Sequence, residues 1–321
     1  MIKQFIALFL TVLFALVPGT VSAQAYPVKP IKLVVGFPPG GANDTLARLL
    51  AQKLNEAWGQ SVFVENKPGA NAIIATDYVA RSAPDGYTLY VGATGAMTVN
   101  PALYQKLSYD PVKDFVSVVQ IASCAMVMVV NPSRPAKTLA QFIEQAKAKP
   151  GKFSYASGST PFQMATELFK MQAGIDIIHI PYKGSAQAIM AGVAGDTDLV
   201  TVDLPPALPQ IRAGKLRALA VTSLNRASVA PEIPTVSESG LPNFDTGVWT
   251  GIFAPAGTRK EIVDKLHDTV LQIIKTDEFK ARLTELGFEP SNLSQLQFAA
   301  QVKAEIAKWT KVARESNIKI E

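Results

Sequence analysis

The feature that most constrains this fold is an alternation of short apolar runs and amphipathic segments, joined by loops rich in glycine and proline. The apolar runs are rich in β-branched residues, which favours strands. The segments between them place apolar side chains at helical spacing, as Leu46, Leu50 and Leu54 do. Such alternation indicates an α/β fold whose parallel or mixed sheet is covered on both faces. The expected strands are 31–35, 62–65, 88–92, 121–130, 153–156, 177–180, 199–202, 216–222 and 249–253.

The first 25 residues have the layout of a secretory signal peptide. Lys3 supplies a positive charge, Phe5–Val17 is an apolar run without charge, and small residues follow. Cleavage is expected after Ala25, with Ala23 as the alternative. The apolar run is short for a membrane span, which needs ~20 residues, so an uncleaved anchor is the less favoured reading. The sequence therefore predicts a periplasmic protein.

Chain length favours two lobes. Cleavage after residue 25 would leave 296 of the 321 residues, more than one hydrophobic core usually organises. We expect the run at 121–130 to carry the chain into the second lobe and the strand at 249–253 to bring it back, which makes a two-strand hinge. Residues 26–126 and 248–321 would form lobe one, and 127–247 lobe two. The last amphipathic segment, 294–316, is expected to pack on lobe one.

Composition argues against several functions. The formal net charge is +5, and the basic residues are scattered, so nucleic acid is not an expected partner. Cys124 is the single cysteine, and its apolar surroundings predict a buried hydrophobe that forms no internal disulfide. His179 and His267 are the two histidines, each expected in a structural role. Neither metal-ligand spacing nor a hydrolase or cofactor motif is present, which favours a binding protein without catalytic residues or metal.

The loop after the first strand is the first candidate binding element. It contains two prolines that stiffen a turn and two glycines that let a ligand approach backbone N–H groups. A helix follows, and its N-terminus attracts negative charge, so the loop suits a carboxylate or a phosphate. The aspartate in the first turn either caps the helix or contacts the ligand. The candidates are Phe37, Pro38, Pro39, Gly40, Gly41 and Asp44.

Two later strand–helix junctions have the same character. In the first, Thr160 is expected to cap a helix that starts at Pro161, with Gln163 completing a capping box. In the second, glycine and serine amides could donate to an anion beside a tyrosine and a lysine. Ligands of open α/β sheets bind beyond the carboxyl ends of strands, where two further polar residues also lie. The candidates are Ser157, Gly158, Ser159, Thr160, Tyr182, Lys183, Gly184 and Ser185, with Thr94 and Asp203 at the two other strand ends.

These motifs together resemble one family. The segment Tyr26–Asp44 is similar to the mature start of the Bug-type receptors of tripartite tricarboxylate transport systems. The resemblance continues through most of the remaining chain, at 65–70, 83–89, 107–115, 181–185, 234–240 and 254–258. The chain departs from the usual pattern at Gly36, at Asn71–Ile74, where glycines are common, and at Gln163, where histidine is common.

The resemblance implies a two-lobed periplasmic binding fold of the Venus flytrap, type II-like class, with two hinge-crossing strands. It implies that the loops at 37–41, 157–160 and 182–185 close on a small organic carboxylate, with Asp203 near the cleft. We expect delivery to a membrane transporter, a monomeric state, and neither a cofactor nor enzymatic activity. A periplasmic sensor for a signalling receptor is the alternative, and a secreted enzyme is the less favoured one.

Overall fold

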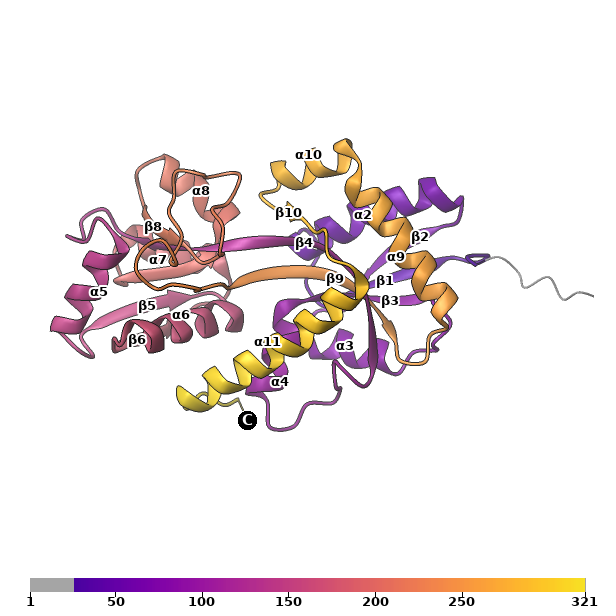
Figure 1. Cartoon of the computed structure of the whole chain (residues 1–321), viewed down its shortest axis with the longest axis horizontal. Coiled ribbons are helices and arrows are strands. Elements are labelled where there is room, and N and C mark those ends of the chain that lie inside the picture. The colour runs from indigo at the N-terminus through magenta and orange to yellow at the C-terminus, as the bar shows by residue number, and fades with distance from the viewer. Residues whose placement is uncertain (1–25, 321) are drawn as a thin grey trace, which may run out of the picture.

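The protein is described by a computed structural model that places residues 26–320, so the expected signal peptide lies outside the described residues. The chain folds into two α/β lobes, as the sequence predicts, and the lobes share a curled, mixed sheet of ten strands (Figure 1). The strand order is β2-β1-β3-β9-β4-β7-β5-β6, with β10 and β8 also paired to β4. The strands are β1 (Ile31–Val35), β2 (Val62–Asn66), β3 (Thr88–Ala93), β4 (Phe115–Val130), β5 (Phe153–Ser157), β6 (Ile177–Pro181), β7 (Leu199–Asp203), β8 (Arg217–Val221), β9 (Gly247–Pro255) and β10 (Glu289–Pro290).

Strand β4 joins the lobes, and β9 runs antiparallel beside it. Its first part pairs with β9 as far as Ala125, opposite Gly247, and from Met126 onward it pairs with β7. In Figure 1 the two long strands cross the gap between the lobes side by side. Both expected crossings, at 121–130 and at 249–253, therefore lie in the hinge.

Helices cover both faces of the sheet in each lobe. In the first, α2 and α9 pack on one face, and α3 and α11 on the other. In the second, α7 and α8 pack on one face, and α5 and α6 on the other. The helices are α2 (Ala42–Trp58), α3 (Ile73–Ala80), α4 (Asn100–Leu103), α5 (Leu139–Ala148), α6 (Thr160–Ala173), α7 (Ser185–Ala194), α8 (Leu204–Arg212), α9 (Lys260–Lys275), α10 (Asp277–Glu285) and α11 (Gln295–Glu315), with short helical turns η2 (Ala70–Ala72) and η3 (Gly95–Val99).

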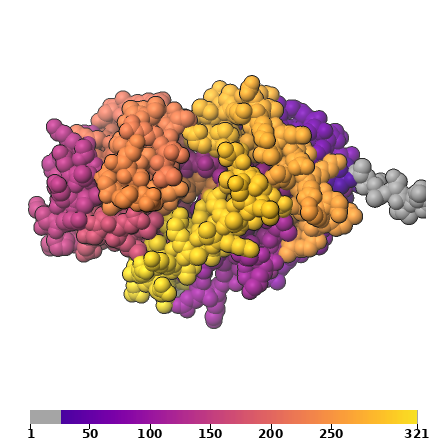
Figure 2. All heavy atoms as spheres, in the orientation of Figure 1, coloured from indigo at the N-terminus to yellow at the C-terminus, as the bar shows by residue number. Residues whose placement is uncertain are grey.

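The C-terminal helix α11 packs on the first lobe, as expected, and it also contacts the second lobe. It packs on η3, α4 and β4 in the first lobe and on α6 in the second. Its Trp309 is buried in one apolar cluster with Leu103 and with Met164 of α6. Figure 2 shows the helix lying across the two lobes. Helical periodicity identified its apolar face but could not reveal that two partners share that face.

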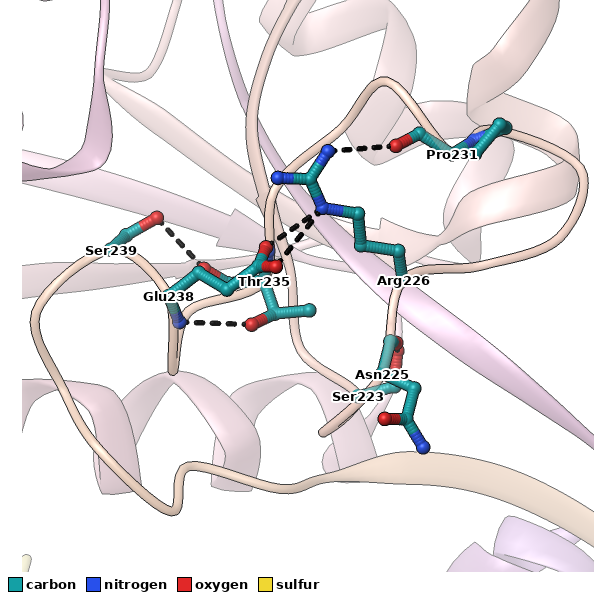
Figure 3. Close-up of polar contacts among 7 residues, drawn as sticks. All are labelled: Ser223, Asn225, Arg226, Pro231, Thr235, Glu238 and Ser239. Carbon is teal, nitrogen blue, oxygen red and sulfur yellow. Dashed lines mark hydrogen bonds and ion pairs between the residues drawn. The ribbon is translucent and has the colours of Figure 1, made fainter.

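The long connection from β8 to β9 contains no regular helix or strand and is held by its own polar contacts (Figure 3). The guanidinium Nε of Arg226 donates to both carboxylate oxygens of Glu238, at 3.1 and 2.9 Å, and Nη1 donates to the carbonyl of Pro231. Thr235 accepts a hydrogen bond from the Glu238 N–H. This segment therefore forms an ordered connection that packs against the second lobe.

Candidate functional site

A cavity of about 660 Å³ lies between the lobes, where the starts of α2, α6, α7 and α8 approach the hinge strands. That size suits a small organic ligand. It also lies beyond the carboxyl ends of β1, β5, β6 and β7, where ligands of α/β sheets bind. The sequence candidates that line it are Phe37, Gly40, Thr94, Gly158, Ser159, Thr160, Gly184, Ser185 and Asp203.

The other candidates lie around the cavity without lining it. Ser157 is buried, and its hydroxyl is 2.8 Å from Nε2 of His179. Tyr182 packs against the core of the second lobe. Lys183 is exposed, and its N–H donates to the side chain of Gln187. The candidates outside the lining are Pro38, Pro39, Gly41, Asp44, Ser157, Tyr182 and Lys183.

Asp44 supports the first loop from behind. Its side chain is buried, and it accepts hydrogen bonds from the Gly40 N–H at 2.9 Å, from Arg48 at 2.9 Å and from Asn66 at 2.8 Å. Burial acts to raise the pKa of this carboxyl, but the three donors outweigh burial and hold the pKa below its usual range. Its position in the first turn also suits the helix dipole. Asp44 was expected either to cap the helix or to contact the ligand. In the structure Gly41 is the N-cap residue, and Asp44 does not line the cavity.

The second and third loops are joined backbone to backbone. The Tyr182 N–H donates to the Ser157 carbonyl at 2.9 Å, and the Gly184 N–H donates to the Gly158 carbonyl at 3.0 Å. A Cβ atom added at Gly158 would lie only 2.4 to 2.6 Å from the backbone of Gly184 and Ser185, so no side chain fits there. The glycines therefore place the starts of α6 and α7 side by side at one wall of the cavity.

The start of α6 differs from the expected capping box. The N-cap is Ser159, with no side-chain capping bond, and Thr160 is already the first helical residue. Pro161 follows it in the first turn and has no N–H of its own. The expected bond pattern between Thr160 and Gln163 is therefore wrong. Thr160 lines the cavity.

The hinge and the C-terminal part supply lining residues that the sequence did not point to. Trp249 and Thr250 come from β9, Cys124 comes from β4, and Phe288 follows α10. The Trp249 N–H donates to the Thr94 hydroxyl at 2.7 Å, and this hydrogen bond holds Thr94 next to β9 on the cavity lining. These residues sit in apolar strands or after a helix, so only the three-dimensional arrangement reveals them. Asn43, Asn71, Pro205 and Pro206 also line the cavity and were missed.

Asp203 is the only charged residue of the described chain that lines the cavity. Burial raises its pKa to about 6, and a hydrogen bond from the Ser185 hydroxyl, 3.2 Å away, opposes that rise. Cys124 lies nearby, buried as expected, and burial raises the pKa of its thiol well above the ordinary value. An anionic ligand in this cavity would therefore be held by N–H and hydroxyl groups and not by a basic side chain.

The two histidines lie outside this cavity. His179 is stacked on Tyr155 with ring centroids 4.8 Å apart, and burial lowers its pKa. His267 lies on α9, where its Nδ1 is 3.0 Å from Asp268. Within residues 26–320, no group of three or more His, Cys, Asp or Glu side chains could hold a metal ion. No helix in that range is long and apolar enough to cross a membrane.

Comparison with known proteins agrees with this architecture. A family model described as the tripartite tricarboxylate transporter family receptor matches residues 46–318. The protein BugT of Bordetella pertussis is 35% identical over 307 residues, which cover 95% of this chain and 94% of that protein.

Solved structures agree as well. Rpa4515 of R. palustris with adipate is 37% identical, covers 92% of this chain and 99% of that chain, and superimposes with a TM-score of 0.81. MatC from Rhodopseudomonas palustris with bound malate is 32% identical, covers 89% of this chain and 99% of that chain, and has a TM-score of 0.76.

Proposed function

The chain belongs to the tripartite tricarboxylate transporter receptor family, and on that basis we propose that it binds a small organic carboxylate in the cavity between its lobes. The observation that carries the proposal is the convergence of helix N-termini on one cavity from both lobes. The first N–H groups of a helix have no partner within it and carry partial positive charge. They suit an anion, and two relatives have adipate and malate bound.

The binding mechanism is closure of the two lobes on the ligand. The first lobe presents the start of α2 with Phe37 and Gly40, and the second lobe presents the starts of α6 and α7. A ligand that touches both walls binds the closed arrangement more tightly than an open one, so it shifts the population toward closure. The hinge strands β4 and β9 are where the backbone would bend.

The remaining expectations stay part of this proposal. We place the lobe boundaries at 26–126 with 248–321 and at 127–247, which is supported by the change of partner along β4 after Ala125. The protein works in the periplasm after removal of residues 1–25, and it acts as a monomeric receptor without catalytic activity. The closed form delivers its ligand to a membrane transporter of the tripartite type.

A thermal-shift screen of the chain from Tyr26 onward tests the proposal. Small organic acids are compared with neutral molecules of similar size at fixed pH and salt. A ligand at 100 times its dissociation constant stabilises the folded state by about 2.7 kcal/mol, which gives a clear rise in melting temperature. We expect carboxylates, and no neutral analogues, to give that rise.

Two tryptophan variants locate the site. Ser159 is exposed and lines the cavity, so Ser159→Trp should fill the cavity and abolish the shift. Ser61 is exposed beside the edge strand β2 and away from the cavity lining, so Ser61→Trp should keep the shift. Stabilisation that survives Ser159→Trp, or no stabilisation by any carboxylate of a folded protein, would contradict the proposed function.

A further inference from the structure

Hydrogen-bond donors gather on one side of the cavity. The starts of α6 and α7 contribute N–H groups that have no partner within their helices. Ser159 and Thr160, which carry hydroxyl groups, also line the cavity at the start of α6. This side therefore offers a carboxylate several donors and partial positive charge.

The start of α8 has the opposite character. Its N–H groups are missing or used, because Pro205 and Pro206 have none and the Leu204 N–H donates to the Cys124 sulfur. Asp203 precedes this helix as its N-cap residue but makes no capping bond. What this helix start presents to the cavity is therefore a carboxylate acceptor beside apolar proline rings.

Asp203 also lacks a compensating cation. Within residues 26–320 its carboxylate accepts one hydrogen bond, from Ser185, so most of its acceptor capacity is unused. No lysine, arginine or histidine from that range lines the cavity. The neighbouring titratable group, Cys124 of β4, is a neutral thiol whose hydrogen bond goes to the Ala125 carbonyl. A second carboxylate of a ligand placed here would meet an acceptor of the same charge.

We propose that the ligand is an amino-carboxylate, whose carboxylate binds at the starts of α6 and α7 and whose ammonium group donates to Asp203. The inference rests on the proposed function and makes Asp203 the residue that selects among carboxylates. An ammonium group neutralises the buried carboxylate and forms a charge-assisted hydrogen bond. A plain dicarboxylate can fill the same position only with one extra proton, shared with Asp203, whose raised pKa makes that uptake easier at acidic pH.

Matched ligand pairs test this selection by titration calorimetry at pH 7.5. The pairs are succinate with L-aspartate, adipate with L-2-aminoadipate, and benzoate with 4-aminomethylbenzoate. In at least one pair the amino member should bind the unmodified protein about tenfold more tightly or better, as a hydrogen bond to a charged group implies. Plain dicarboxylates should bind more tightly at pH 5.5 than at pH 7.5.

Two variants separate selection from a general effect of charge. Asp203→Asn keeps the shape of the side chain and should reduce the amino preference at least tenfold. Asp196→Asn removes one carboxylate from an exposed position of the same lobe and should leave the preference unchanged. The melting temperature of each variant shows that it is folded.

The outcomes distinguish the two proposals. If carboxylates bind but plain dicarboxylates equal or exceed their amino partners at pH 7.5, the selection by Asp203 is wrong and the carboxylate receptor stands. A preference that Asp203→Asn leaves intact also overturns it. If no carboxylate of either kind binds, the proposed function fails together with this inference.

Discussion

Asp44 and Asp203 both lie at junctions between a strand and a helix, yet their surroundings differ completely. Asp44 is 2% exposed and accepts three hydrogen bonds, and its pKa is held low. Asp203 accepts one bond from a hydroxyl and has a pKa raised to about 6. The difference comes from neighbours: Arg48 one turn onward and Asn66 on the adjacent strand satisfy the first carboxylate. One aspartate therefore stabilises a loop, and the other is available to a ligand.

The largest expected effect comes from removing the satisfied carboxylate. Asp44→Ala leaves the Gly40 N–H and the Asn66 amide without their acceptor, so the free energy of unfolding should fall by about 2–3 kcal/mol. Chemical denaturation measures this loss. Asp77→Ala removes a surface partner of Arg81 and should cost less than about 1 kcal/mol. Equal losses in the two variants would show that Asp44 does not support the loop.

The wall beside Asp203 depends on Gly158. Gly158→Ala would force the backbone of Gly184 and Ser185 away, which should cost about 1–3 kcal/mol and weaken carboxylate binding. Gly95→Ala is the matched control, because the added carbon meets Pro161 only at 3.4 Å on the same cavity lining. If Gly158→Ala binds carboxylates as tightly as the unmodified protein, the close contact between Gly158 and Gly184 is not needed for binding.

Removing the unsatisfied carboxylate should stabilise the ligand-free protein. The folded pKa of Asp203, about 6, lies above its ordinary value of 3.8, so the wild-type protein loses stability as pH rises from about 4 to 6. The amide in Asp203→Asn does not ionise, so this variant does not lose stability over that pH range. It should be more stable than wild type by about 1–2 kcal/mol at pH 7.5. At pH 4 the gain should vanish. Denaturation curves at both pH values measure it, and destabilisation at pH 7.5 would contradict the account.

The smallest effect is expected from Ser185→Ala. It removes the hydroxyl that donates to Asp203, so the pKa of that carboxyl should rise further. Stability should change by less than about 1 kcal/mol, since only one partly buried hydrogen bond is lost. The loss of stability should still begin near pH 4, but it should continue to a pH above about 6 in a denaturation series. An unchanged profile would mean that this hydroxyl does not affect Asp203.

The sequence predicted the arrangement of the chain well because that arrangement follows from local patterns. Alternating strands and helices, the crossing at 121–130 and the return at 249–253 all depend on periodicity and on the order of elements. Proline and glycine at strand ends also pointed to the three loops, and residues of each loop line the cavity. Their role in holding a ligand stays a prediction.

The sequence could not distinguish residues that line the cavity from residues that support it. Ser157 and Asp44 have the same composition signals as Ser159 and Asp203, but their partners, His179 and Asn66, come from other strands. Contributions from the hinge were missed for the same reason, because an apolar strand gives no sign of which side chains reach a cavity. The double contact of α11 likewise depends on how two lobes meet.

A crystal structure of the chain from Tyr26 onward, with the carboxylate that stabilises it most, tests the account most directly. The carboxylate oxygens should accept hydrogen bonds from backbone N–H groups and hydroxyls at the starts of α6 and α7, with no lysine or arginine in contact. A ligand bound outside this cavity, or one held by an ion pair with a basic side chain, would contradict it.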